Sequence, residues 1–157
     1  MVIGVISDTH HRKLPGECVE RLSAVDAILH GGDFTAREDL EALQRIGPPV
    51  HAVRGNGDDP WLVAKLPLMR TVEFDGVQIG LMHDAGPAKG RLNRLHKRFP
   101  EARAVIFGHS HIPLHEAFGD FEIFNPGSPT DRRRQPRHSM GIATLEDGKI
   151  SFDLILL

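Results

Sequence analysis

Short apolar runs that stop abruptly at polar side chains recur five times along this 157-residue sequence. The runs are rich in valine, isoleucine, leucine and alanine, and each has glycine within it or close by. Runs of this kind, too short for a helix and bounded by turn residues, are typical of buried β-strands. We therefore predict strands over residues 2–6, 27–29, 50–53, 77–82 and 104–107.

The segments between these runs show two further patterns. Helical spacing and proline or glycine stop signals predict helices over residues 15–24, 36–46 and 87–99. Asp-Gly or Gly-Asp pairs between apolar segments predict β-hairpins around residues 75–76, 119–120 and 147–148. Taken together, the residues predict an α/β layered domain, with parallel strands flanked by helices and antiparallel strands forming a second sheet.

Composition narrows the class of protein. Hydrophobic residues make up 40% of the chain and charged residues 25%, which is typical of a globular domain, and we expect a single domain over residues 1–157. One cysteine excludes an internal disulfide. The sequence has neither an apolar run near the ~20 residues of a membrane span nor the basic segment of a secretion signal, so a cytoplasmic location is expected. A net charge of -2 gives no general attraction to nucleic acid.

Each of the five predicted strands is followed by side chains that can bind a metal ion. In α/β sheets, functional residues gather at the carboxyl ends of strands, so these side chains are expected to lie close together. Two carboxylates, four imidazoles and one amide exceed the four ligands of a closed zinc site and suit two ions about 3.5 Å apart. A nitrogen and oxygen set without thiolate favours Mn²⁺, Fe, Zn²⁺ or Ni²⁺. The candidate ligands are Asp8, His10, Asp33, Asn56, His83, His109 and His111.

The order of the motifs DTH, GGD, GNGD, a later histidine, GHSH and NPGS resembles the calcineurin-like metallophosphoesterase superfamily. The length, the VISDTH start and NPGSPTDRRR are similar to its compact prokaryotic phosphodiesterases. The resemblance implies a four-layer αββα sandwich of two mixed β-sheets flanked by helices, and two divalent metal ions, with Mn²⁺ preferred. It implies that Asp8, His10, Asp33 and His111 hold one metal, and that Asp33 bridges to a second held by Asn56, His83 and His109.

The activity implied by this resemblance is hydrolysis of a small phosphate ester, most specifically a phosphodiester, by a hydroxide held between the two ions. Asp33, Asn56 and His83 are then catalytic as well as metal-binding. The same fold also serves as the retromer scaffold subunit of vacuolar protein sorting, so a metal-supported interaction module is the alternative. Gly57 stands where relatives carry histidine or cysteine, and it cannot protonate a leaving group. This departure predicts a preference for diesters or activated aryl esters over alkyl monoesters.

The sequence allows two interpretations of the role of each of four further residues. His30 either supports the metal site or is a buried, satisfied histidine, and Asp84 either orients an imidazole or faces solvent. Asp58 either anchors the loop of the GNGD motif or caps the helix after Pro60, and we favour the cap. Arg132, in a basic run that extends to residue 137, either steers phosphate to the site or belongs to a solvated loop or subunit contact. The apolar C-terminal LILL leaves a homo-oligomer open.

Overall fold

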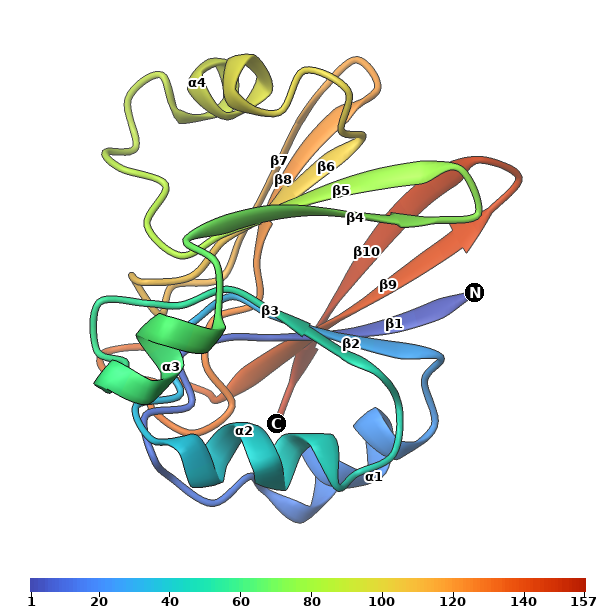
Figure 1. Ribbon diagram of the computed structural model, residues 1–157. Coiled ribbons are helices and arrows are strands. Elements are labelled where there is room, and N and C mark those ends of the chain that lie inside the picture. The colour runs from blue at the N-terminus through green and yellow to red at the C-terminus, as the bar shows by residue number, and fades with distance from the viewer.

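The computed structural model describes all 157 residues and places ten strands in two five-stranded sheets. The first sheet consists of β1 (Val2–Ile6), β2 (Ala27–His30), β3 (Val50–Ala52), β9 (Ser139–Glu146) and β10 (Lys149–Leu156). Its order is β10-β9-β1-β2-β3 (Figure 1). Strands β1, β2 and β3 are parallel, whereas β9 runs antiparallel to both β1 and β10.

The second sheet has the order β4-β5-β6-β8-β7. It consists of β4 (Met69–Phe74), β5 (Val77–Met82), β6 (Ala104–Ile106), β7 (Leu114–Phe118) and β8 (Phe121–Asn125). Strand β6 pairs in parallel with both β5 and β8, and antiparallel strands β4 and β7 form the two edges. The parallel strands of the molecule are thus divided between the two sheets.

Both sheets are mixed, as the family resemblance implies. The expectation drawn from strand patterns alone, that antiparallel strands would form a sheet of their own, is wrong. The three predicted hairpins are confirmed as β4–β5, β7–β8 and β9–β10. A hairpin turn determines only the pairing of its own two strands. The next neighbour depends on which sheet edge is free, and β9 lies against the edge of β1.

Four helices flank the sheets. Helices α1 (Gly16–Ser23) and α2 (Arg37–Gln44) cover the outer face of the first sheet, and α4 (Arg91–Arg98) covers the second (Figure 1). The short helix α3 (Pro60–Lys65) follows β3. Helix α4 begins later than predicted because Gly90 has a left-handed φ of 71° directly before it. All four are too short or too polar to cross a membrane.

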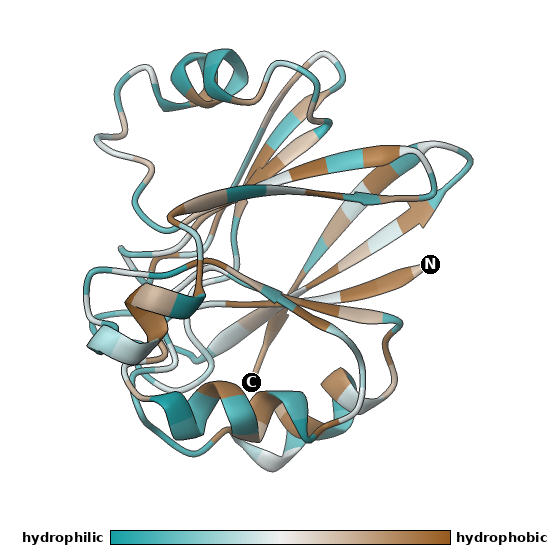
Figure 2. Ribbon diagram, viewed as in Figure 1, coloured by the Kyte–Doolittle hydropathy of each residue, from teal (hydrophilic) through white to brown (hydrophobic).

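Three apolar clusters join these layers. The largest lies between the sheets and contains 14 buried residues, among them Ile3 of the first sheet and Ile79 of the second. Phe124 stacks on Phe152 in this layer, with ring centroids 4.6 Å apart. The other two clusters join the first sheet to α1 and α2 and the second sheet to α4. The hydropathy of the elements agrees with these layers. In Figure 2 the strands are mostly hydrophobic, whereas α2 alternates between hydrophobic and polar residues.

Candidate metal centre

The candidate site lies where the carboxyl ends of strands from both sheets meet. The sequence predicts that five strand ends gather, and they do, but they come from two sheets rather than one. Asp8, His10, Asp33 and Asn56 follow β1, β2 and β3 of the first sheet, and His83, His109 and His111 follow β5 and β6 of the second. The structure brings all seven side chains into one connected cluster.

Backbone conformation at the strand ends is unusual. Five of the seven residues have a positive φ, a region that side-chain-bearing residues seldom adopt but that aspartate, asparagine and histidine tolerate best. Such a conformation turns the chain sharply where the strand ends. The residues and angles are Asp8 (58°), His10 (46°), Asp33 (64°), His109 (73°) and His111 (61°).

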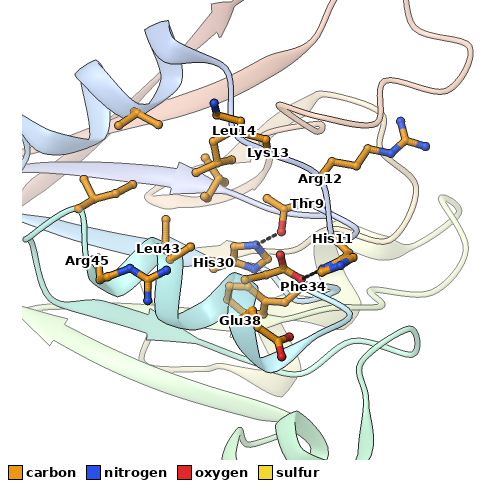
Figure 3. Close-up of a pocket in the computed structure, with 15 residues that line it drawn as sticks. Thr9, His11, Arg12, Lys13, Leu14, His30, Phe34, Glu38, Leu43 and Arg45 are labelled. Carbon is orange, nitrogen blue, oxygen red and sulfur yellow. Dashed lines mark hydrogen bonds and ion pairs between the residues drawn. The ribbon is translucent and has the colours of Figure 1, made fainter.

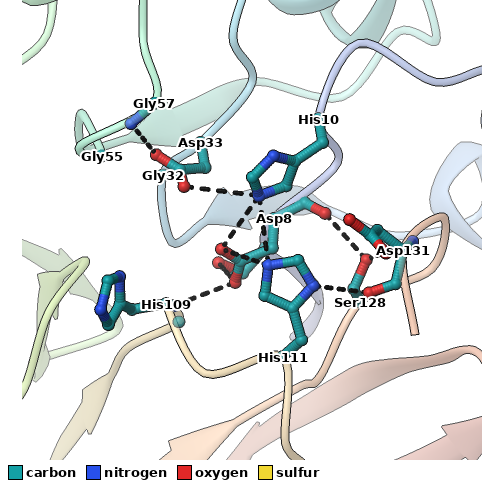
Figure 4. A network of polar contacts seen from close by, with 12 residues as sticks. Asp8, His10, Gly32, Asp33, Gly55, Gly57, His109, His111, Ser128 and Asp131 are labelled. Atoms are coloured by element: carbon teal, nitrogen blue, oxygen red, sulfur yellow. Dashed lines mark hydrogen bonds and ion pairs between the residues drawn. The ribbon is translucent and has the colours of Figure 1, made fainter. Parts of the chain in front are cut away.

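One group of donor atoms surrounds Asp8 (Figure 4). The Asp8 Oδ1 atom lies 3.4 Å from His111 Nε2 and 3.7 Å from His10 Nε2, and the two imidazole nitrogens are 3.1 Å apart. The three residues form a group that could hold a metal ion, and Asp8 and His111 are buried. A carboxylate oxygen and two imidazole nitrogens at this spacing are suitable ligands for a divalent transition metal.

A second group surrounds Asp33. Its Oδ2 atom lies 3.3 Å from His83 Nε2 and 3.4 Å from His10 Nε2, which places this carboxylate between the two groups. Asn56 Oδ1 lies 3.0 Å from His83 Nε2 and 3.1 Å from His109 Nδ1, so amide and imidazole donors converge here. Asp8 also belongs to this second group, with Oδ1 3.8 Å from His83 Nε2.

Hydrogen bonds behind the site direct the donor atoms inward. His83 Nδ1 donates to the Gly31 carbonyl at 2.8 Å, which leaves Nε2 facing the cluster, and His111 Nδ1 donates to the Asp131 carbonyl in the same way. The Asp8 Oδ2 atom accepts hydrogen bonds from the Ser7 hydroxyl at 2.8 Å and the His109 amide at 3.0 Å. Only the other oxygen of Asp8 therefore remains available.

The surroundings of this remaining oxygen, Asp8 Oδ1, show whether the residues present fit a metal ion. Asp8 is fully buried, and its Oδ1 has no hydrogen-bond partner. A buried carboxylate oxygen without a partner is costly, because it has lost water and gained nothing in exchange. Three imidazole nitrogens lie within 3.8 Å of it. A divalent cation among these atoms satisfies the oxygen and matches the donor chemistry, so the residues present fit a metal ion.

The charges of the cluster support this fit. Burial by itself would raise the pKa of Asp33, but the hydrogen bond and charge of His83 and the Gly57 amide outweigh burial and lower this pKa to about 2. Asp33 therefore stays ionised at neutral pH. The Asp8 carboxylate raises the pKa of His10. Burial would lower the pKa of His83, but the two carboxylates raise it.

Comparison with known families decides the identity of the chain. The model of the calcineurin-like phosphoesterase superfamily domain matches residues 1–148, which span all seven candidate ligands. The chain belongs to the calcineurin-like phosphoesterase superfamily. It is therefore a metallophosphoesterase by family, with a buried His/Asp cluster where a metal can bind.

Individual relatives agree with this assignment. A probable metallophosphoesterase of Methanothermobacter thermautotrophicus is 35% identical over 136 residues, which cover 83% of this chain and 78% of the relative. A novel archaeal phosphodiesterase has a similar structure, with a TM-score of 0.77, 23% identity, and coverage of 99% of this chain and 100% of the other. Vps29 of Entamoeba histolytica in complex with zinc has a TM-score of 0.77, 22% identity, and coverage of 99% of both chains. The two structural likenesses establish the fold.

Two positions of this phosphoesterase require glycine, because other atoms of the site lie where a Cβ atom would be. A Cβ atom on Gly108 would lie 2.0 Å from the Ser7 hydroxyl and 2.5 Å from Asp8 Oδ2. A Cβ atom on Gly55 would lie 2.0 Å from Asp33 Oδ1. Any larger residue at either position would displace a carboxylate of the cluster.

The structure decides between the two readings of Asp58. Its carboxylate accepts backbone N–H groups from Gly55 at 2.7 Å, Thr35 at 2.8 Å and Asp33 at 3.3 Å, so it anchors the loop that carries Asn56. The prediction that Asp58 caps α3 is wrong. The cap is Asp59, which accepts the Leu62 amide at 2.8 Å. Sequence favoured the wrong one of two adjacent aspartates because either can reach a helix end.

His30 is a buried, satisfied histidine of this phosphoesterase. Its Nδ1 accepts the Gly32 amide at 3.0 Å, its Nε2 lies 3.1 Å from the Thr9 hydroxyl, and its ring stacks on Phe34. Burial lowers the pKa of His30 to about 3. The ring is therefore neutral, and it supports Thr9 between two candidate ligands without joining the cluster.

Asp84 and Arg132 lie outside the cluster. Asp84 is exposed; its Oδ1 accepts the Gly86 amide at 2.8 Å, and its Oδ2 is 3.9 Å from His109 Nε2. Arg132 is also exposed and donates to the Gln135 carbonyl within its own turn. Asp84 thus faces solvent, and its carboxylate lies beside an imidazole without a hydrogen bond to it.

Two residues that hold the site were not singled out from sequence. Asn125 donates to the Gly108 carbonyl, and Ser128 donates to the Asp8 carbonyl while accepting the Asp131 amide. Both belong to the NPGS motif at the end of β8. The rule that identified the candidate ligands, polar residues at the end of a buried strand, would have identified Asn125 as well.

A cavity of about 510 Å³ lies beside the cluster but is not the candidate site (Figure 3). Its walls come from the segment between β1 and α1, including Thr9 and Leu14, and from α2. His30 and Phe34 also line it, whereas none of the seven candidate ligands does. His30 and Thr9 therefore lie between this cavity and the candidate ligands.

Proposed function

We propose that this phosphoesterase hydrolyses phosphodiesters with two divalent metal ions, Mn²⁺ foremost, bound by the seven clustered side chains. The observation that carries the proposal is the buried Asp8 Oδ1 atom, which has no hydrogen-bond partner and lies within 3.8 Å of three imidazole nitrogens. A buried anionic oxygen that faces three imidazole nitrogens suits a cation and serves no evident structural purpose without one.

Asp8, His10, Asp33 and His111 are assigned to the first ion, and Asn56, His83 and His109 to the second, with Asp33 shared. The position of Asp33 Oδ2, about equally distant from His10 and His83, supports its role as the bridge. Asp8 Oδ1 also lies 3.8 Å from His83 Nε2, so Asp8 would help to hold the second ion as well. Two ions carry four positive charges, and the two aspartates offset two of them, so the site attracts a phosphate anion.

When bound, the ions supply a water of lowered pKa and neutralise charge on the phosphoryl oxygens. The protein holds the groups around them. The Gly57 amide donates to Asp33 Oδ1, and the Ser7 hydroxyl donates to Asp8 Oδ2. The other oxygen of each aspartate therefore faces the site. Asn56 presents its Oδ1 to the imidazoles, which leaves its amide N–H groups to donate to a phosphoryl oxygen.

Position 57 has no side chain that could protonate a leaving group, because it is glycine. This favours diesters with good leaving groups as substrates. The Gly57 amide donates to Asp33 Oδ1 at 2.7 Å, which places this residue at the cluster, where a side chain could reach a departing oxygen. General acid assistance is worth about 10²–10⁴-fold. Esters whose leaving group departs as a stable anion need this assistance least.

Hydrolysis of bis-p-nitrophenyl phosphate by the metal-free protein, before and after Mn²⁺ is added, tests the proposal. We expect turnover only with Mn²⁺, a loss of about 100-fold or more in His109→Ala, and little change in His115→Ala, which removes a histidine paired with Glu122 outside the site. Repeating the assay with Zn²⁺, Fe²⁺ and Ni²⁺ ranks the metals. The absence of Mn²⁺-dependent turnover would reject the enzyme and favour the scaffold alternative, as would a His109→Ala variant equal to wild type.

A further inference from the structure

A second cavity, of about 490 Å³, opens directly onto the candidate metal centre. Asn56 and His83, both candidate ligands, form part of its wall, and we call it the methionine cavity because Met69 and Met82 also line it. It extends from the cluster between α3 and the end of α4. Its volume is within the range that accommodates a small organic ligand.

Two arginines line the methionine cavity without a carboxylate partner. Arg54 donates to the Val63 carbonyl at 2.9 Å, and Arg98 contacts the Met69 sulfur at 3.3 Å, and neither forms a salt bridge. A guanidinium has five N–H donors, so most of them remain free in each case. The one carboxylate in the wall, Asp84, is held by the Gly86 amide and lies beside His109. The cavity therefore offers uncompensated positive charge away from the metals.

Apolar side chains occupy the rest of the wall. Val63 is 41% exposed and Leu68 58% exposed, although both are large hydrophobic residues. Met69 and Met82 lie beside them and are only partly buried. Methionine adapts its shape to an irregular partner, which suits a wall that contacts a ligand. An apolar or aromatic group placed here would cover surface that water otherwise contacts.

We propose that the methionine cavity holds one arm of the substrate, an apolar or aromatic body that ends in a second anionic group. The body lies against Leu68, Met69 and Met82, and the anion binds Arg98 and Arg54 while the scissile phosphodiester lies at the metals. This inference rests on the proposed function and names its substrate class, a phosphodiester with a further negative charge on one arm. Arginine suits this role because its planar fork matches phosphate and carboxylate oxygens.

A matched pair of substrates tests the inference. Thymidine 5′-(p-nitrophenyl phosphate) and the same compound with a 3′-phosphate share a leaving group and differ only in the distal anion. With Mn²⁺ present, we expect kcat/KM to be about tenfold higher for the phosphorylated compound, mainly through a lower KM. The ratio falls towards one in Arg98→Gln, which alters an exposed side chain on α4. Leu68→Ser raises KM for both compounds alike, since both present the same body.

Arg103→Gln is the matched control. This partly exposed arginine pairs with Asp120 and directly precedes β6, at the end opposite to His109, so its loss should leave both substrates unaffected. Binding of thymidine 3′,5′-bisphosphate and thymidine 5′-monophosphate to the Mn²⁺-loaded protein, measured by calorimetry, supplies a readout that needs no turnover. Turnover with equal kcat/KM for both substrates, or a ratio unchanged in Arg98→Gln, would overturn the inference and leave the proposed function standing. Arginine-dependent binding selectivity without any turnover would instead overturn the proposed function and support the anion site.

Discussion

At the scale of single residues, the site depends on side chains that tolerate a left-handed backbone. Asp8, His10, Asp33, His109 and His111 all combine a positive φ with a ligand atom directed at the cluster. Sequence identifies these residues because aspartate and histidine after an apolar run serve both needs. It does not reveal that Asp8 Oδ1 lacks a partner, because that depends on residues that follow three strands from two sheets.

Protonation of His30 should control acid stability. Its pKa is lowered by burial to about 3, whereas in the unfolded chain it is about 6.5. Between these values the unfolded state binds a proton that the folded state does not, so the free energy of unfolding falls as pH decreases, in total by about 5 kcal/mol. Chemical denaturation of the metal-free protein from pH 7 to pH 4 measures this slope. His30→Gln should flatten it, and parallel curves for the two proteins would contradict the assignment.

The residue at position 57 should determine leaving-group preference. We expect the wild-type protein to cleave an aryl phosphodiester far faster than phosphoserine, because Gly57 supplies no proton to an alkyl leaving group. Gly57→His should narrow that ratio by about 100-fold. Gly57→Ala is the control, since it adds a Cβ atom 3.3 Å from the Asp33 carboxylate without adding a proton donor. Equal rates of the wild-type protein on both substrates would refute the role given to Gly57.

At the scale of elements, variants of the adjacent residues Asp58 and Asp59 are expected to affect different properties. One residue holds the geometry of the candidate site, and the other stabilises helix α3. Asp59→Ala removes the cap of α3 and should lower the free energy of unfolding by about 1 kcal/mol while Mn²⁺ affinity is kept. Asp58→Ala releases the backbone amides of Asp33, Thr35 and Gly55 and should weaken Mn²⁺ binding by about 10–100-fold. Denaturant titration and metal-binding calorimetry on both variants distinguish the two effects. The reverse pattern would show that Asp58 is the cap.

Elements themselves were largely predictable, whereas their pairing was not. All five apolar runs are strands, and the three hairpins occur at the predicted turns, because periodicity and turn residues act over a few positions. The position of the β9–β10 hairpin depends instead on contacts with β1, more than 100 residues away in sequence. Interactions at that distance leave no local pattern that could be recognised.

At the scale of the whole molecule, metal binding should stabilise both sheets together. The candidate ligands come from both sheets, and one apolar cluster already joins the sheets between them. Mn²⁺ at 100 times its Kd adds about 2.7 kcal/mol, which for a chain of this size corresponds to about 5–10 °C in Tm. Calorimetric unfolding with Mn²⁺ and with EDTA should show one transition that shifts by this amount. Asp8→Asn should lose most of the shift, and two separate transitions would contradict the coupling.

The sequence by itself determined the strands, the turns and the chemical identity of seven clustered side chains, because each is encoded by neighbouring residues. Only the tertiary structure decided how parallel strands divide between two sheets, that Asp58 anchors a loop while Asp59 caps a helix, and that Arg54 and Arg98 line one cavity. These outcomes depend on which distant surfaces pack together and on where a side chain then points. Local chemistry therefore identifies the candidate ligands, and long-range packing determines what they surround.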